Sequence, residues 1–436
     1  MKAFHLPNLK YAASETFTVG ELQIEVPRLT AHEVRAICEG ITAARPKLLE
    51  LSDAEVVTAI DGAAQILLDT KSDEGKAARE LLPAATGYSR ETIEDILQHM
   101  CVDWSAPSLQ RLLLSEATAA HERTVARGPR LAYHIFSGNV PGVSVTSLIR
   151  ALLVRSASIG KTAAGEPVLP VLFLRALNRV APTIADCIAV TYWPSERDDL
   201  HHAALDAADI VIVYGGEDAV RSVASHRHAV IHGPKISFGV VGPDPDADIA
   251  KEIARACAAY DQQGCVSPHT VFVHHSANPR VIAEAIAKEL EAIAHSLPRR
   301  TLAPEDAVAV RNARTSAEFR AIGGGDVAIY GSDTSSYAVI YDSVTELTPS
   351  CLNRTLYVHP YHSIDELRAA VEPHRAVLQS AAIAGFNDSR EIALQLIDAG
   401  VTRITSFERL PWPPMDWKHD GRGPLRELLT YHDIEI

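Results

Sequence analysis

One cysteine stands where a nucleophile could work. Cys265 follows Gln263 and Gly264, between a helix-like segment and the apolar, strand-like segment 269–274. A thiol in a glycine-flanked break is held by backbone and open to a substrate, as a cysteine nucleophile requires. A lone cysteine is more often a small buried apolar side chain, so the other candidate residues must decide its role.

An asparagine occupies a second break of this kind. Asn139 lies in the run Ser-Gly-Asn-Val-Pro-Gly at 137–142, between a strand-like and a helix-like segment. Its side-chain amide could donate a hydrogen bond to an oxyanion. The alternative is that Asn139 caps the helix that follows.

Three further residues could bind a phosphorylated cofactor. Lys161 belongs to Gly-Lys-Thr at 160–162, but Arg155 stands where the first glycine of a phosphate loop is needed, so we reject a P-loop. Lys161 could still bind a cofactor hydroxyl or phosphate, or be a solvated surface lysine. Gly215 and Gly216 end a strand and open a helix, where their N–H groups could meet a pyrophosphate or simply form a tight turn.

The sequence indicates neither a metal site nor a serine hydrolase. The histidine pairs, such as 201–202 and 274–275, are adjacent rather than one helical turn apart, and there is no HExxH motif. No GxSxG nucleophile elbow occurs either. We therefore expect no bound metal and no α/β-hydrolase chemistry.

Composition places the chain among ordinary globular proteins. Its 436 residues, 47% hydrophobic and 22% charged, suffice for two or three domains with ordered structure nearly throughout. Six cysteines without CxxC spacing should be reduced thiols. No signal segment or long apolar run occurs, which predicts a cytoplasmic protein without a membrane span. A formal charge of −14 argues against nonspecific binding to nucleic acid or anionic membranes.

The pattern of apolar segments predicts an α/β fold. After a strand-like start, residues 31–127 are expected to be helical, with capping boxes beginning at Thr30 and Ser52. From residue 131, short apolar strands alternate with helices, which indicates a parallel sheet covered on both faces and a Rossmann-type domain. The predicted division is an N-terminal strand and helical segment packed on the cofactor domain (1–127), the cofactor domain (128–245), a catalytic domain (246–410) and a C-terminal segment (411–436).

Taken in order, the motifs resemble the LuxC family of acyl-CoA reductases, within the aldehyde dehydrogenase superfamily. The resemblance implies an aldehyde dehydrogenase-like fold: a Rossmann-type NADP-binding domain, an α/β catalytic domain and a small oligomerisation element. It covers most of the chain from about residue 130 to the end. The motifs that carry it are 137–143, 146–148, 158–161 with 166–167, 264–265 with 267–268, 352–355 and 417–422.

The resemblance also implies a reaction. Cys265 would attack an acyl-CoA, fatty acyl by family expectation, and Asn139 with the Cys265 N–H would stabilise the oxyanion. CoA would leave, and hydride from NADPH would then yield the aldehyde. Lys161, Gly215 and Gly216 would contact the cofactor, and Glu346 would hold its nicotinamide ribose.

Two departures from the superfamily pattern refine this expectation. Hydrolytic aldehyde dehydrogenases carry a general-base glutamate in a motif that here reads Ile-His-Gly-Pro-Lys (231–235), so the acyl-enzyme should persist and CoA-linked chemistry is favoured. NAD-preferring relatives place a glutamate three residues after the lysine that matches Lys161. Ala164 stands there instead, which removes repulsion toward a 2′-phosphate and predicts NADPH.

Several alternatives remain open from the sequence. The enzyme could act oxidatively on an aldehyde, or the chain could be a non-catalytic acyl-carrying scaffold. A homo-oligomer is expected, and a partner enzyme could supply or accept the acyl group or the aldehyde. In the segment Trp417–Asp420, either His419 or Asp420 could transfer protons, or the segment could only anchor the C-terminal part of the chain.

Overall fold

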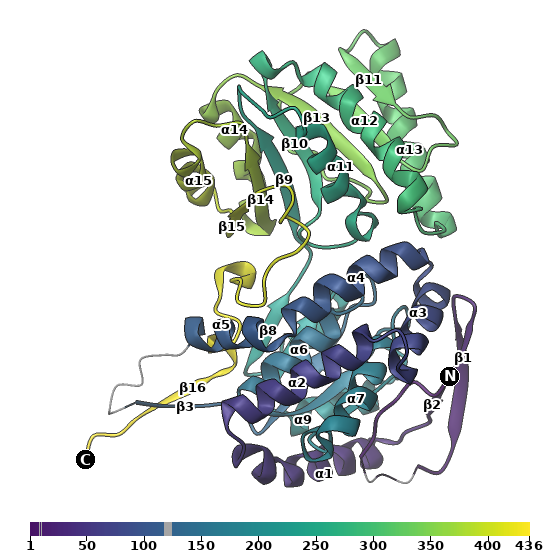
Figure 1. Ribbon diagram of the computed structural model, residues 1–436, viewed down its shortest axis with the longest axis vertical. Coiled ribbons are helices and arrows are strands. Elements are labelled where there is room, and N and C mark those ends of the chain that lie inside the picture. The colour runs from purple at the N-terminus through teal and green to yellow at the C-terminus, as the bar shows by residue number, and fades with distance from the viewer. Residues whose placement is uncertain (8, 10, 117–123) are drawn as a thin grey trace. The chain divides into compact units, whose positions relative to one another are not determined.

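The computed structural model of the protein describes residues 1–7, 9, 11–116 and 124–436. The chain forms two compact units (Figure 1). Unit 1 comprises Met1–Gly233, Pro414–Lys418 and Arg422–Ile436, and unit 2 comprises Pro234–Pro413 and His419–Gly421. The functional division predicted from the sequence remains a prediction.

Unit 1 is built on a five-stranded parallel sheet in the order β6-β5-β4-β7-β8. The first strand is central and the order reverses between β4 and β7, which is the arrangement of a Rossmann-type sheet. All residues of β4, β6 and β7 are buried, because helices cover both faces of a parallel sheet. The strands are β4 (Leu131–Ile135), β5 (Ala157–Lys161), β6 (Ile188–Thr191), β7 (Ile210–Tyr214) and β8 (Ala229–His232), and the helices between them are α6 (Val143–Leu153), α7 (Leu169–Val180), α8 (Pro182–Ala185), α9 (Asp198–Ala207) and α10 (Glu217–Ser222).

An N-terminal helical segment packs on this sheet domain within unit 1. The capping boxes predicted at Thr30 and Ser52 are confirmed at the starts of α1 and α2. Helix α1 packs against α9, and α2 packs against α7. The segment contains the antiparallel pair β1 (Ser14–Val19) and β2 (Leu22–Pro27), followed by α1 (Ala31–Leu49), α2 (Asp53–Leu68), α3 (Asp73–Thr86), α4 (Arg90–Asp103) and α5 (Ala106–Glu116).

The expectation of helix up to residue 127 is wrong at its end. Residues 124–127 form strand β3 (Thr124–Arg127), which pairs with β16 (Thr430–Asp433) near the C-terminus. A strand whose partner lies some 300 residues away has no local signal. Residues 117–123, also expected to be helical, lie outside the described residues.

Unit 2 contains a seven-stranded sheet in the order β11-β12-β13-β10-β9-β14-β15, parallel except for β11. Neighbouring residues of β10 point to opposite cores: Val271 and Val273 pack with α11 and α12, and Phe272 packs with α14 and α15. The strands are β9 (Ile236–Val241), β10 (Pro268–His274), β11 (Val327–Tyr330), β12 (Ala338–Asp342), β13 (Thr355–Tyr361), β14 (Leu378–Ala384) and β15 (Arg403–Thr405), and the helices are α11 (Ile249–Ala258), α12 (Pro279–Ser296), α13 (Pro304–Ile322), α14 (Ile364–Val371) and α15 (Ser389–Asp398).

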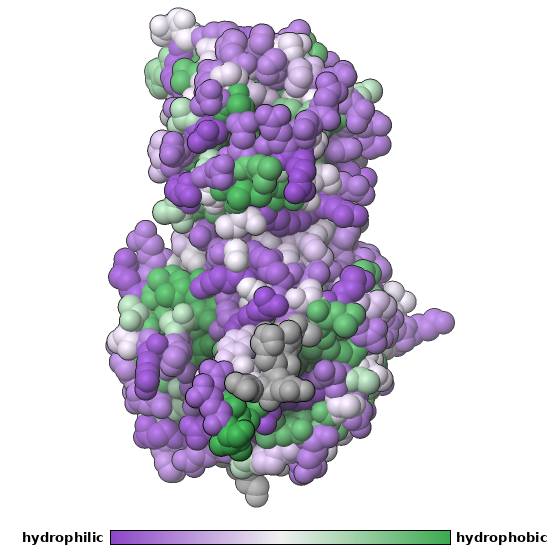
Figure 2. All heavy atoms as spheres, turned by 90° about the vertical axis from the view of Figure 1, so that its left-hand side faces the viewer, coloured by the Kyte–Doolittle hydropathy of each residue, from purple (hydrophilic) through white to green (hydrophobic). Residues whose placement is uncertain are grey.

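Short 3₁₀ helices complete the described chain. They are η1 (Ala259–Gln262), η2 (His275–Ala277), η3 (Glu372–Val377), η4 (His419–Gly421) and η5 (Arg426–Leu428). Hydrophilic side chains predominate on the face drawn in Figure 2, where hydrophobic ones form small separate patches. Among the described helices, none is both long and apolar enough to cross a membrane. The six cysteines, all of them described, are free thiols, as predicted.

A buried tryptophan joins the helical segment to the sheet domain of unit 1. Trp104, directly after α4, is fully buried and packs edge-on against Phe173 of α7. Its indole N–H donates to Thr146 Oγ1 in α6 at 3.0 Å. This hydrogen bond fixes the first turn of α6, the helix that follows Asn139.

We expect Thr146→Val to destabilise the protein by about 1–3 kcal/mol, because the buried indole N–H loses its acceptor. Urea unfolding at constant protein concentration measures the change. Thr146→Ser, which keeps the hydroxyl acceptor, is the matched control and should lose less stability. Equal losses of stability in the two variants would contradict a role for this hydrogen bond.

Candidate active site

The carboxyl edge of the unit 1 sheet collects four of the predicted site residues. Asn139 follows β4, Lys161 is the last residue of β5, and Gly215 and Gly216 follow β7. These strands are neighbours and parallel, so the four residues lie along one edge. Asn139 and Gly215 flank the point where the strand order reverses, which is where ligands bind in open α/β sheets.

Asn139 lies in an anchored loop. Tyr88 Oη donates to the Asn139 carbonyl at 2.9 Å. Helix α6 has Gly142 as its N-cap, three residues after Asn139, which is exposed. Gly142 has φ +102°, and a Cβ there would lie 2.9 Å from Met100 Cγ, so the turn that presents Asn139 depends on glycine.

Lys161 differs from a solvated surface lysine. The side chain is half-buried at the end of β5, and burial lowers the pKa of its ammonium while the Glu196 carboxylate opposes that change. An ammonium partly removed from water gains from an anionic or hydroxyl partner. The position therefore suits a cofactor phosphate or ribose.

The two glycines after β7 leave room for a ligand. The Gly215 N–H donates to the His232 carbonyl of β8 at 3.2 Å, and a Cβ on Gly215 would lie 2.9 Å from Ala219 Cβ. A Cβ on Gly216 would meet no atom within 4 Å, so the space beside it is open. This edge fits the close backbone approach that a dinucleotide pyrophosphate requires.

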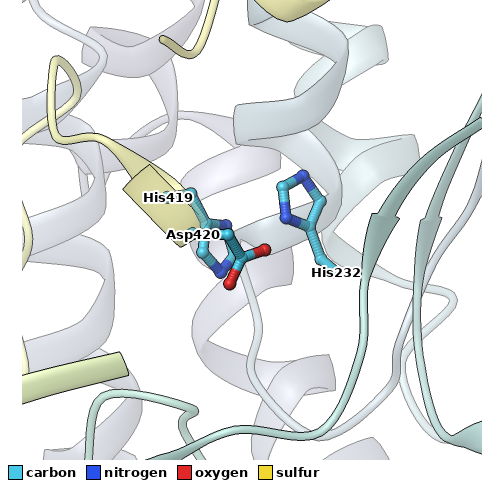
Figure 3. Close-up of side chains that lie close together, drawn as sticks. All are labelled: His232, His419 and Asp420. Atoms are coloured by element: carbon cyan, nitrogen blue, oxygen red, sulfur yellow. The ribbon is translucent and has the colours of Figure 1, made fainter. Parts of the chain in front are cut away.

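Cys265 lies in unit 2, in the turn between η1 and β10. Its side chain is half-buried, and Ser237 Oγ of β9 donates to its carbonyl at 2.8 Å. The Sγ atom lies 3.9 Å from Nε2 of His419, within hydrogen-bonding distance for sulfur. His419 and Asp420 both project from the short helix η4 (Figure 3).

Charged groups surround the thiol within unit 2. Burial, with a smaller contribution from the Asp420 carboxylate, raises the pKa of Cys265 to about 12. Arg403 and Lys235 act in the opposite direction. Lys235 Nζ lies 3.3 Å from Asp420 Oδ1, and burial lowers the pKa of Arg403 to about 10. Cys265 is therefore protonated at rest, with cations nearby that favour the thiolate.

Two left-handed runs of backbone hold the Cys265 turn. Tyr260–Gln262 have φ between 49° and 65°, and Leu352–Arg354 have φ between 56° and 66°. Three consecutive non-glycine residues in this region are strained, and such strain persists only where surrounding contacts impose it. We call these two runs and the contacts between them the clamp.

A fully buried ion pair fastens the clamp. Arg354 Nε donates to Asp261 Oδ1 at 2.6 Å, and neither side chain is exposed. The Asn353 N–H donates to the Asp261 carbonyl at 3.0 Å, and the Arg300 N–H donates to Asp261 Oδ2 at 2.9 Å. Gln262 Nε2 donates to the Pro268 and Thr355 carbonyls at 2.8 and 3.0 Å. The motif at 352–355 therefore supports the Cys265 turn from the neighbouring strand.

Glu346 lies in unit 2 and is exposed, between β12 and β13. Its Oε1 accepts a hydrogen bond from Thr348 Oγ1 at 3.3 Å, and Thr348 is bonded in turn to Thr270 of β10 through the backbone. The segment that carries Glu346 is thus anchored to the strand that follows Cys265.

Comparison with protein families identifies the chain. The model of the acyl-CoA reductase (LuxC) family matches residues 48–431, which is most of the sequence. The protein belongs to the LuxC family. The family resemblance inferred from the motifs is therefore confirmed.

Curated relatives of this LuxC-family chain are long-chain acyl-protein thioester reductases. Long-chain acyl-protein thioester reductase 2 of Photobacterium leiognathi is 26% identical over 306 residues, which cover 68% of this chain and 62% of the relative. The reductase of Aliivibrio fischeri is 26% identical over 310 residues, covering 69% and 63%. The chain thus spans less than two thirds of the length of these relatives.

Solved structures show that the LuxC-family chain has the aldehyde dehydrogenase-like fold predicted from the sequence. An NAD-dependent benzaldehyde dehydrogenase from Corynebacterium glutamicum superposes with a TM-score of 0.76 at 16% identity, covering 99% of this chain and 98% of that one. An NADP-dependent glyceraldehyde-3-phosphate dehydrogenase from Bacillus halodurans, complexed with NADP, gives 0.72 at 13% identity, covering 97% and 96%.

The predicted site residues divide between the units of this LuxC-family protein. Cys265 and Glu346 belong to unit 2, and the other four belong to unit 1. The roles of all six remain predictions. Nothing local in the sequence marks the charged side chains around the thiol, Lys235 and Arg403. The segment that carries His419 and Asp420 has a recognisable motif, but the sequence leaves its role open.

We expect Asp261→Asn and Arg354→Met each to cost about 3–5 kcal/mol of stability, because each leaves a buried ionised partner uncompensated. The double variant should cost clearly less than the sum, since it removes both charges. Urea unfolding of the four proteins measures this cycle. Asp306→Asn breaks the more exposed pair with Arg300, 2.7 Å apart, and should cost less than about 1 kcal/mol. Additive losses in the cycle would contradict the pairing.

Proposed function

We propose that the protein reduces an acyl thioester to the aldehyde through an acyl-enzyme on Cys265, with NADPH as the hydride donor. The observation that carries the proposal is the Cys265 thiol on a clamped turn, half-buried and within hydrogen-bonding distance of His419. Family membership supports the same chemistry. A turn held by strained backbone and a buried ion pair is pre-organised for attack on a carbonyl carbon.

The substrate is an acyl group activated as a thioester. The family is described as acyl-CoA reductase, whereas the curated relatives are named for acyl-protein thioesters. The attack by sulfur is the same in both cases, because both substrates present a thioester carbonyl and release a thiol. We propose long-chain acyl thioesters of CoA or of an acyl-carrying partner protein, and activity on each decides between them.

Asn139 would stabilise the oxyanion together with the Cys265 N–H. An amide donor on an anchored loop costs no reorganisation when charge develops on the carbonyl oxygen. In hydrolytic aldehyde dehydrogenases a glutamate then activates water, but here Ile231 of β8 stands at that position. The acyl-enzyme would therefore wait for hydride instead of being hydrolysed.

The cofactor would bind along the carboxyl edge of the unit 1 sheet. Bound NADPH supplies the hydride that reduces the acyl group to the aldehyde. Lys161 would meet a hydroxyl or phosphate of the adenosine half, and the open backbone at Gly215 and Gly216 would meet the pyrophosphate. Ala164, exposed after β5, leaves room and no negative charge for a 2′-phosphate, and Glu346 would hold the nicotinamide ribose.

We expect the purified protein to oxidise NADPH and release trappable aldehyde when given a long-chain acyl-CoA or an acylated carrier protein. Cys265→Ala should abolish both the acyl adduct, followed by mass spectrometry, and the aldehyde. Asn139→Ala should lower kcat about 10²–10³-fold, the usual effect of removing an oxyanion donor. Aldehyde formation by the Cys265→Ala protein would disprove the acyl-enzyme, and a wild-type protein that oxidises aldehydes without reducing thioesters would reverse the assigned direction.

Ala164→Glu tests the choice of cofactor. A carboxylate beside the 2′-phosphate should lower kcat/KM for NADPH at least about tenfold, which corresponds to about 1.4 kcal/mol of repulsion, and should affect NADH far less. Ala164→Gln has the same size without the charge and serves as the control. A wild-type preference for NADH, or equal effects of Glu and Gln, would contradict this assignment.

A further inference from the structure

We propose that His419 takes the proton from the Cys265 thiol as the sulfur attacks the acyl carbon, and returns it to the departing thiolate. This inference rests on the proposed function, because it assigns the proton of that same reaction. The sequence leaves two roles open for the segment Trp417–Asp420, proton transfer or anchoring of the chain. The proposal assigns it proton transfer.

The geometry places the imidazole at the reacting atom. His419 Nε2 lies 3.9 Å from Cys265 Sγ, and within unit 2 this is the one side-chain hydrogen bond described for the thiol. His419 is buried, and the backbone beyond it turns sharply: Asp420 has φ 53° and Gly421 has φ 74°. This bend forms η4, so the imidazole extends from a defined turn rather than from an open chain end.

The electrostatics of unit 2 explain why the thiol needs an acceptor. With its pKa raised to about 12, the Cys265 thiol is protonated at pH 7, so attack by a pre-formed thiolate is rare. The charged groups that act on this sulfur are Asp420, Lys235 and Arg403. Asp420 disfavours the thiolate and is paired with Lys235, and the Arg403 guanidinium has no lone pair to accept a proton. The His419 imidazole, whose Nε2 contacts the sulfur, is the acceptor that the geometry offers.

No proton is gained or lost over the acylation step. The Cys265 S–H bond breaks as the S–C bond to the acyl carbon forms, and the proton moves to His419 Nε2. When the tetrahedral oxyanion collapses, the C–S bond of the substrate breaks and the imidazolium protonates the departing sulfur. His419 is neutral again at the acyl-enzyme, and the net change is acyl transfer from one thiol to another.

The test measures Cys265 alkylation by iodoacetamide in the full-length protein, without substrate or cofactor, at pH 5–9. Peptide mass spectrometry follows Cys265 and, in the same digest, the half-buried Cys351 as an internal control. In wild type we expect the Cys265 rate to rise through the titration of a histidine, whose ordinary pKa is about 6.5. In His419→Gln that inflection should be lost, with a rate at pH 7 lower by about 10²-fold or more. His295→Gln, on the exposed end of α12, should behave as wild type.

Each outcome decides the proposal. A slower Cys265 with an unchanged Cys351 supports proton transfer to His419. An unchanged rate and pH profile for Cys265 in His419→Gln overturns it. If Cys351 also changes, the substitution has altered the fold, and His419→Gly with added imidazole decides: recovery of Cys265 alkylation supports the proposal, and its absence overturns the proposal.

This alkylation experiment is independent of the reductase activity. A protein that fails to make aldehyde but shows the histidine-dependent alkylation would refute the proposed function and keep the Cys265–His419 pair. Acylation of Cys265 by octanoyl-CoA links the alkylation experiment to the reductase activity. His419→Gln should slow formation of the acyl adduct, whereas a failure of the hydride step alone would leave that adduct intact.

Discussion

The buried pair between Asp261 and Arg354 is the contact on which the turn that carries Cys265 depends. It lies where no water is available to solvate either charge, so the two side chains must stay together. By staying together they hold two strained backbone runs against each other, and one of these runs ends three residues before Cys265. The turn that carries Cys265, and with it the proposed chemistry, thus relies on an ion pair in which neither the thiol nor the histidine takes part.

The environment of Cys265 balances two opposed requirements. Burial and a nearby carboxylate keep the sulfur protonated, which protects a reactive thiol from oxidation and alkylation. Two cations and an imidazole favour loss of the proton when an electrophile arrives. Under the proposed function the thiol would be unreactive at rest and reactive toward a carbonyl carbon, and this balance depends on residues that are distant in sequence.

Much of the fold followed from local patterns. The capping boxes at Thr30 and Ser52, the alternation of β4, β5 and β7 with their helices, and the strand after Cys265 all have short-range signatures. The edge of the unit 1 sheet followed as well, because residues after neighbouring parallel strands must lie together. These features need only periodicity and turn residues.

What the sequence could not supply depends on distant pairing. Strand β3 exists because β16 pairs with it, and His419 reaches Cys265 across 154 positions. The clamp has no signature either, since residues such as Leu352 and Tyr260 ordinarily avoid the left-handed region. Of the clamp, only the motif at 352–355 is visible in the sequence, and its residue types do not indicate whether its role is structural or chemical.

Ile231 has a consequence for what the enzyme would do when reductant runs short. An apolar side chain at that position cannot supply the base that hydrolytic aldehyde dehydrogenases use, so under the proposed function an acyl group on Cys265 would leave chiefly by reduction or by return to a thiol. Without reductant, the protein would then act as a transacylase that equilibrates acyl groups among the thiols that reach it. Acyl groups would then be conserved rather than lost to hydrolysis, and the ratio of reduced to oxidised nicotinamide would set how many leave as aldehyde.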